Sequence, residues 1–171
     1  MSGSNFFLDK SDPASWRALN GLALKVADAA QQAGVPRSVL ELVNVRISQL
    51  NGCAFCLDLH VRLAREAGAS EQQLAVLPAW RETTAFTPLE RAALSIGEAA
   101  TELPGNEHMQ TEMAAVRAVL TDAQYSVLQW AAVTMNAFNR VSILSRHPVR
   151  PRASAAARER GAGQEPVGSQ T

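Results

Sequence analysis

The stretch ELVNVRISQLNGCAFCLDLH, residues 41–60, holds both cysteines of the chain and decides the fold around them. Apolar residues recur at helical spacing through its first half, the Asn-Gly dipeptide at 51–52 breaks the pattern, and helical spacing then resumes. We therefore expect two helices, over about residues 36–50 and 53–67, that form an antiparallel hairpin at the Asn-Gly break.

The rest of the ordered chain is also predicted to be helical. A proline follows a capping residue at position 12, and capping-box sequences begin at Thr87 and Thr121. The sequence shows no strand-type alternation and no glycine-rich nucleotide or phosphate loop, so the predicted fold class is an all-α bundle. Additional helices are expected over about residues 13–32, 88–103, 109–119 and 122–145. A short helix capped by Ser70 and an irregular connection over 77–86 are expected between the hairpin and residue 88.

Length and composition predict one folded domain. A chain of 171 residues can bury about two-thirds of its unfolded surface in a single core. We place this domain in residues 1–147, with a redox core over about residues 36–67. Residues 148–171 are rich in Pro, Gly, Ala, Ser and Arg and lack aromatic side chains, so we expect a disordered C-terminal tail there.

The charge balance gives no support for nucleic acid or membrane partners. Sixteen Lys and Arg residues match sixteen Asp and Glu residues, so the formal net charge is zero. The last expected helix is apolar on nearly all sides, but Gln129, Asn136, Asn139 and Arg140 would make a lipid-facing span costly. We expect this helix at the centre of the bundle or in a contact between subunits, with its polar groups hydrogen bonded.

The cysteine usage indicates a reversible dithiol. Two cysteines three positions apart do not suit a secreted disulfide scaffold, whose crosslinks close long loops. The first ten residues, MSGSNFFLDK, also lack the basic and apolar segments of a secretory signal. We therefore expect a cytoplasmic protein whose thiols are reduced at rest.

Cys53, Cys56 and His60 share the apolar side of the expected second hairpin helix. A helix N-terminus favours a thiolate, and an imidazole one turn beyond Cys56 can accept a thiol proton. Glu41, on the first helix of the hairpin, is placed to face His60 and orient it. Such a set suits reduction of a peroxide or disulfide, with Cys56 favoured as the attacking sulfur and Cys53 as the competing assignment.

Two other interpretations fit the same residues. The dithiol could belong to a helical oligomeric module that acts as a redox sensor or a structural element without turnover. Alternatively, the two cysteines and His60 could supply three ligands to a zinc ion. Structural zinc sites usually have four protein ligands. The remaining histidines, His108 and His147, are expected in unrelated segments.

Glu41, Cys53, Cys56 and His60 match the E-x11-C-x2-C-x3-H pattern, and the chain resembles AhpD-like alkylhydroperoxidases of the carboxymuconolactone decarboxylase superfamily. The amino-acid sequences at residues 46–48, 51–53 and 136–140 also resemble members of that group. The resemblance covers roughly residues 13–147. It implies an AhpD-like helical bundle, a homo-oligomer such as a trimer or hexamer with its site near subunit contacts, and a thiol-dependent peroxidase. The implied partners are a hydroperoxide and a thiol or disulfide electron donor, with no bound cofactor.

The chain departs from the founding AhpD enzymes at Phe55. Those enzymes carry a histidine between their two cysteines, so one member of their proton relay has no counterpart at this position. Docking to a lipoylated partner is likewise a property of those enzymes and not of every relative. The decarboxylases that name the superfamily generally lack the cysteine pair, so the resemblance implies a redox activity here.

Overall fold

The computed structural model describes residues 6–151, and every regular element within that range is a helix. The all-α prediction is therefore confirmed. The elements are α1 (Leu8–Ser11), α2 (Pro13–Gln32), α3 (Arg37–Asn51), α4 (Ala54–Glu66), α5 (Glu71–Val76), the 3₁₀ helix η1 (Leu77–Glu82), α6 (Pro88–Glu102), α7 (Asn106–Arg117) and α8 (Asp122–Leu144). Of the predicted C-terminal tail, residues 148–151 lie in no helix, and residues 152–171 are outside the described range.

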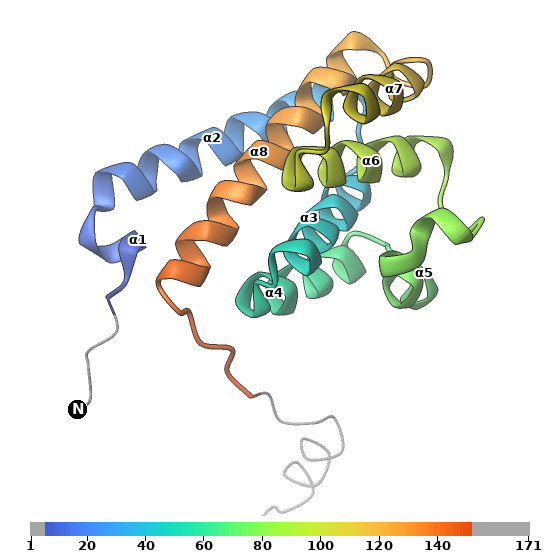
Figure 1. Cartoon of the computed structure of the whole chain (residues 1–171). Helices are drawn as coiled ribbons and strands as arrows, with labels where there is room; N and C mark the ends of the chain where they lie inside the picture. Colours follow the sequence, from blue (N-terminus) through green and yellow to red (C-terminus); the bar gives the residue numbers. More distant parts are fainter. Residues whose placement is uncertain (1–5, 152–171) are drawn as a thin grey trace, which may run out of the picture.

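Helix α3 is the centre of the bundle. It packs against α4, α6 and α8. Helix α2 in turn packs along α8 (Figure 1). Val43 and Ile47 of α3 join the core shared with α2, α6 and α8, whereas Leu42 and Val45 join a second core with α4, η1 and α6. Because both sides of α3 are buried, its residues are fixed relative to every neighbouring helix.

The local signals in the sequence mark most helix ends correctly. Asp12 caps α2 through hydrogen bonds from the N–H groups of Ala14 (3.1 Å) and Ser15 (3.2 Å). Both capping boxes, at Thr87 and at Thr121, are present. These residues satisfy backbone donors that each helix start would otherwise leave without partners.

Three segments differ from expectation. Residues 8–11 form the short helix α1, and residues 77–82 form a 3₁₀ helix where an irregular connection was predicted. Helix α7 starts at Asn106, three residues before the expected start, because Gly105 takes the N-cap position without a side-chain cap. A cap made by backbone alone leaves little signal in the sequence.

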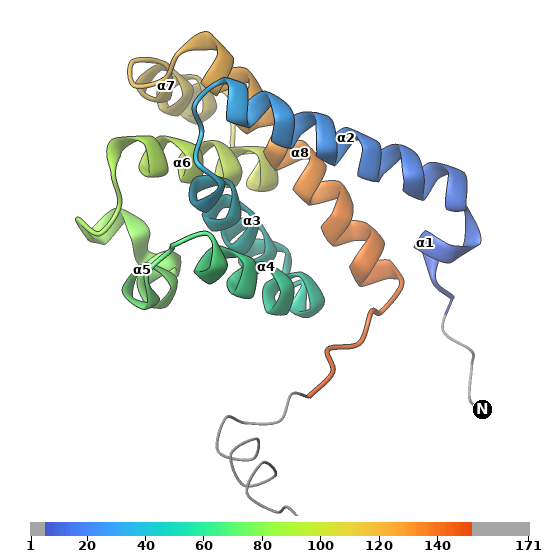
Figure 2. The same cartoon turned by 180° about the vertical axis from the view of Figure 1, so that it is seen from behind.

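Helix α8 packs against α2, α3 and α6, as the expected central position requires, but it is not buried on all sides within one chain. Trp130 and Val133 on its outer side remain 54% and 52% exposed. Figure 2, from behind, shows α8 between α2 on one side and α3 and α6 on the other. The alternative expectation, a contact between subunits, stays a prediction. No helix within residues 6–151 is long and apolar enough to cross a membrane.

Candidate active site

The turn between α3 and α4 places both cysteines at a helix start. Gly52 ends α3 with φ = 67°, a left-handed conformation that glycine adopts without strain. The Cys53 N–H then donates to the carbonyl oxygen of Ser48 (3.0 Å), and Cys53 itself is the N-cap of α4. Its Sγ accepts the N–H of Cys56 at 3.4 Å. Cys53 and Cys56 are joined in a disulfide, with their Cα atoms 5.3 Å apart.

An asparagine cluster holds this turn against α8. The Asn51 amide donates to the side-chain oxygens of Asn136 and Asn139, each at 2.9 Å. Asn139, which is fully buried, donates in turn to the Ser48 hydroxyl (3.2 Å), and Arg140 donates to Asn136 Oδ1 (2.9 Å). Asn136, Asn139 and Arg140 of α8 therefore have the structural hydrogen-bonding role expected of them.

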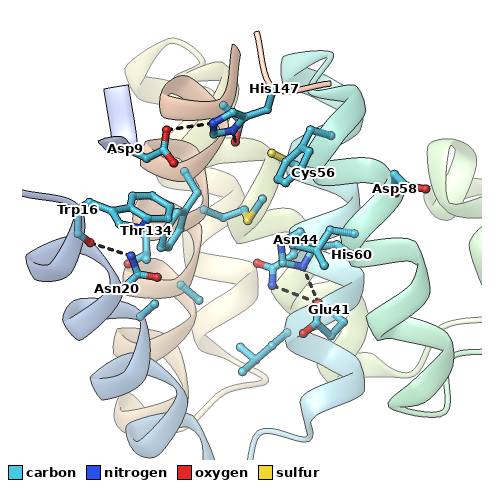
Figure 3. A pocket seen from close by; sticks show the side chains of 18 of the residues that line it. Asp9, Trp16, Asn20, Glu41, Asn44, Cys56, Asp58, His60, Thr134 and His147 are labelled. Carbon is cyan, nitrogen blue, oxygen red and sulfur yellow. Dashed lines mark hydrogen bonds and ion pairs between the residues drawn. The ribbon is translucent and has the colours of Figure 1, made fainter. Parts of the chain in front are cut away.

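Glu41 and His60 form a close pair across the α3–α4 hairpin. Glu41 Oε2 lies 2.7 Å from His60 Nδ1, and the two side chains are only 9% and 15% exposed (Figure 3). A carboxylate at this distance accepts a hydrogen bond from the Nδ1–H group, which leaves Nε2 as the acceptor nitrogen of the neutral ring. The predicted facing of Glu41 and His60 is confirmed. Arg37 also approaches Glu41, at a longer 3.8 Å from Oε1.

A cavity of about 940 Å³ adjoins these residues. It lies among α1, α2, α3, α4, α8 and the segment after α8, and apolar residues and polar or charged residues contribute equally to its lining. Cys56, His60 and Glu41 line it, whereas Cys53 does not (Figure 3). Cys56 is thus the cysteine that faces the space where a small molecule could bind.

His147 corrects the expectation that the other histidines lie in unrelated segments. It lines the same cavity, and its ring packs against Phe55 with centroids 5.1 Å apart. Its Nε2 lies 3.0 Å from Asp9 Oδ1, and its ring stacks on Phe7. The site therefore contains a second imidazole with a carboxylate partner, although none stands between the cysteines.

No sequence pattern linked Asp9 to His147, because the two are brought together by α1 folding against the end of α8. His108, by contrast, lies on α7 with its side chain 70% exposed, away from the cavity as expected. Within residues 6–151, no three His, Cys, Asp or Glu side chains gather in a way that could hold a metal ion.

Fold and site together define an all-helical protein with a C-x-x-C pair at a helix start, beside a carboxylate-backed imidazole. The family model for the carboxymuconolactone decarboxylase family matches residues 13–99. The chain belongs to that family, and it is an AhpD-like member of it.

Individual relatives agree with this assignment. The chain is 37% identical over 113 residues to the uncharacterized protein YdfG of Bacillus subtilis, covering 66% of this chain and 77% of YdfG. It is 33% identical over 103 residues to an alkyl hydroperoxide reductase AhpD of Azorhizobium caulinodans, covering 58% of this chain and 57% of that protein. The chain thus spans little more than half of that AhpD.

The fold also has a solved counterpart. A crystal structure of an Agrobacterium tumefaciens protein of unknown function, described as a candidate antioxidant defence protein AhpD, superposes with a TM-score of 0.75 at 30% sequence identity. The match covers 86% of this chain and 100% of that one. Such a score over nearly the whole chain supports the AhpD-like fold.

Proposed function

We propose that this protein is a thiol-dependent peroxidase that reduces hydroperoxides through Cys53 and Cys56. The observation that carries the proposal is the shared position of Cys56 and His60 on one cavity, with Glu41 held 2.7 Å behind His60. This arrangement provides a nucleophile, a base and an orienting carboxylate next to a space for substrate. The AhpD-named relative and structural neighbour support the same class of chemistry.

The reaction begins from the reduced pair. His60 Nε2 takes the proton of the Cys56 thiol, and the thiolate attacks the terminal oxygen of the hydroperoxide. A sulfur–oxygen bond forms as the oxygen–oxygen bond breaks, and the leaving alkoxide receives the proton from His60. The products of this step are an alcohol and a sulfenic acid on Cys56.

Cys53 then resolves the sulfenic acid. Its sulfur attacks Cys56 Sγ, the sulfur–oxygen bond breaks, and water leaves with the proton of the Cys53 thiol. The resulting Cys53–Cys56 disulfide is the state present in the structure. A dithiol donor, or two thiol molecules, then reduces the pair and is itself oxidised to a disulfide, so each cycle transfers two electrons from donor to hydroperoxide.

Two further expectations accompany the proposal. A dithiol that must be reduced again in every cycle suits a reducing compartment such as the cytoplasm. The exposed apolar side chains Trp130 and Val133 on α8 support a homo-oligomer, for which the family resemblance suggests a trimer or hexamer.

The test is oxidation of the reduced protein with one equivalent of hydroperoxide, followed by peptide mass spectrometry. We expect an intramolecular Cys53–Cys56 disulfide, and we expect Cys56→Ser to abolish peroxide consumption. In Cys53→Ser, Cys56 should still be oxidised, but only to the sulfenic acid. Two free thiols after peroxide treatment, or full activity in Cys56→Ser, would contradict the proposal.

Turnover distinguishes the enzyme from the redox-sensing alternative. An enzyme consumes many equivalents of hydroperoxide when a dithiol donor such as dithiothreitol is supplied. A sensor is oxidised once and then changes its assembly or its partner binding. The zinc alternative requires near-stoichiometric metal in protein purified under reducing conditions, which elemental analysis measures.

A further inference from the structure

The acidic and basic side chains that line the cavity differ in how they are engaged. The charged and imidazole side chains of the lining are Asp9, Lys10, Arg37, Glu41, Asp58, His60, His147 and Arg150. Asp9 lies against His147 and Glu41 against His60 (Figure 3), and the two carboxylate side chains are only 17% and 9% exposed. Asp58 also has an interaction partner. The formal charges cancel when both imidazoles are neutral, but each carboxylate is already engaged.

Two cations of the cavity have no such partner. Within the part of the chain that the structure describes, neither Lys10 nor Arg150 forms an ion pair with an acidic side chain, and both are exposed. The Lys10 ammonium lies 4.5 Å from the centroid of the Phe7 ring, which itself lines the cavity. Arg37, the third cation, already approaches the Glu41 carboxylate at 3.8 Å. Lys10 and Arg150 are therefore the cations that an anionic ligand can reach without displacing an acidic partner.

The inner part of the cavity differs from its opening. Val26, Ala131 and Met135 line it and are buried, and so is Cys56. Because exposed residues stand at an opening and buried residues behind it, the reactive sulfur and an apolar wall lie inside, whereas the two cations lie at the mouth. A ligand whose apolar part reaches Cys56 can then leave an anionic group at the opening.

We infer that this cavity selects organic molecules that combine an apolar body with a carboxylate, and that Lys10 and Arg150 select for the carboxylate. An ammonium or a guanidinium donates charge-assisted hydrogen bonds to a carboxylate, which are stronger than those to a neutral group of the same shape. The apolar body gains free energy when it leaves water for the inner wall. The substrate class rests on the proposed function: it is an organic hydroperoxide that carries a carboxylate away from the reacting oxygens.

The first test measures binding to the full-length oxidised protein, so no turnover is involved. One probe is 4-(2-hydroxypropan-2-yl)benzoic acid, which is ionised at neutral pH. The other is its carboxamide, which has nearly the same shape without the charge. Isothermal titration calorimetry gives the Kd of each probe at low and at high salt. We expect the carboxylate to bind roughly fivefold more tightly at low salt, as two exposed ion pairs can provide, and the preference to shrink at high salt.

The variants assign the preference to its two cations. Lys10→Gln and Arg150→Gln should each lower the ratio of the two Kd values, and the double variant should bring it below about twofold. The matched control is Lys25→Gln, which removes an exposed positive charge on α2 beside a separate cavity. It changes the net charge as much as either single variant does, and it should keep the fivefold preference.

A second measurement tests the substrate class. It compares kcat/KM for cumene hydroperoxides that carry a para carboxylate or a para carboxamide, with dithiothreitol as the uncharged donor. We expect the carboxylate to have the higher kcat/KM, and the double variant to lose that advantage. Equal values in the wild-type protein would overturn the assignment of a carboxylated hydroperoxide.

Three binding results would overturn the selection by Lys10 and Arg150: equal Kd values for the two probes, a preference that persists in the double variant, or an equal loss in Lys25→Gln. Failure of this inference is separable from failure of the proposed function. A protein that shows the preference in binding but consumes no hydroperoxide would refute the peroxidase alone. A protein that reduces cumene hydroperoxide but binds both probes equally would refute the carboxylate selection alone.

Discussion

The Glu41–His60 pair offers the sharpest test of the chemistry, through the substitution Glu41→Gln. Glutamine keeps the length of the side chain and an oxygen that can accept a hydrogen bond from the Nδ1–H group of His60, but it removes the negative charge. When His60 takes the proton of Cys56, the imidazole becomes positive, and only the carboxylate stabilises that charge. The substitution should therefore slow the reactions of Cys56 without opening the fold.

The structure sets the size of the effect. The two side chains are 9% and 15% exposed, so solvent screens their interaction weakly. A hydrogen bond to a charged group contributes about 1.5–3 kcal/mol, and a neutral one contributes about 0.5–1.5 kcal/mol. The difference of roughly 1–1.5 kcal/mol corresponds to a rate about 5 to 13 times lower.

The assay is the rate of alkylation of Cys56 by iodoacetamide at pH 7, in reduced protein that carries Cys53→Ser so that a single thiol reacts. Arg37→Gln provides the matched control, because Arg37 contacts the same carboxylate at 3.8 Å but is 62% exposed. Exposed ion pairs contribute little, so the control should change the rate less than about twofold. An unchanged rate in Glu41→Gln, or equal losses in both variants, would refute the proposed role of Glu41.

Three predictions concern stability, measured by urea unfolding. Gly97→Ala should destabilise the protein by about 1 kcal/mol, because the added Cβ would lie 3.1 Å from a valine methyl of α3. Gly21→Ala should instead stabilise it by about 0.5–1 kcal/mol, because the added Cβ meets only open space and alanine favours a helix. Asn139→Ala should cost about 2–4 kcal/mol, since it removes two hydrogen bonds to α3, from Asn51 Nδ2 and to Ser48 Oγ, and leaves a cavity at a fully buried position. A hydrogen bond from the Ser15 hydroxyl lowers the pKa of Asp12 below its ordinary 3.8. The contribution of ionised Asp12 to the free energy of unfolding is therefore present above pH 3.8 and is lost as the pH falls through the lowered pKa. The unfolding midpoints of wild type and Asp12→Ala should accordingly converge in acid.

The helices were predictable because local chemistry specifies them. Thr87 and Thr121 mark helix starts through capping boxes, and Gly52 marks an end, each requiring only neighbouring residues. The exposure of one side of α8 was not predictable in this way. Its apolar outer side, with Trp130, reads in sequence like a buried side, because sequence records polarity and not which side faces another helix.

The same distinction applies to the site. Glu41 and His60 were predictable partners because a tight turn fixes the geometry of the two helices that carry them. The cavity and its His147–Asp9 pair were not, because those residues are 138 positions apart and meet only after α1 folds against the end of α8.

The positions of the two sulfurs bear on the order in which substrates react. Cys53 is 2% exposed, does not line the cavity, and accepts the Cys56 N–H at the start of α4. A helix start stabilises a thiolate, so Cys53 is the better leaving group when a donor thiolate attacks the disulfide at Cys56. Hydroperoxide and donor then meet the same sulfur through the same cavity and cannot be bound there together. Initial rates measured over both concentrations should therefore give the parallel double-reciprocal lines of a ping-pong mechanism, whereas intersecting lines would require a second access to the disulfide.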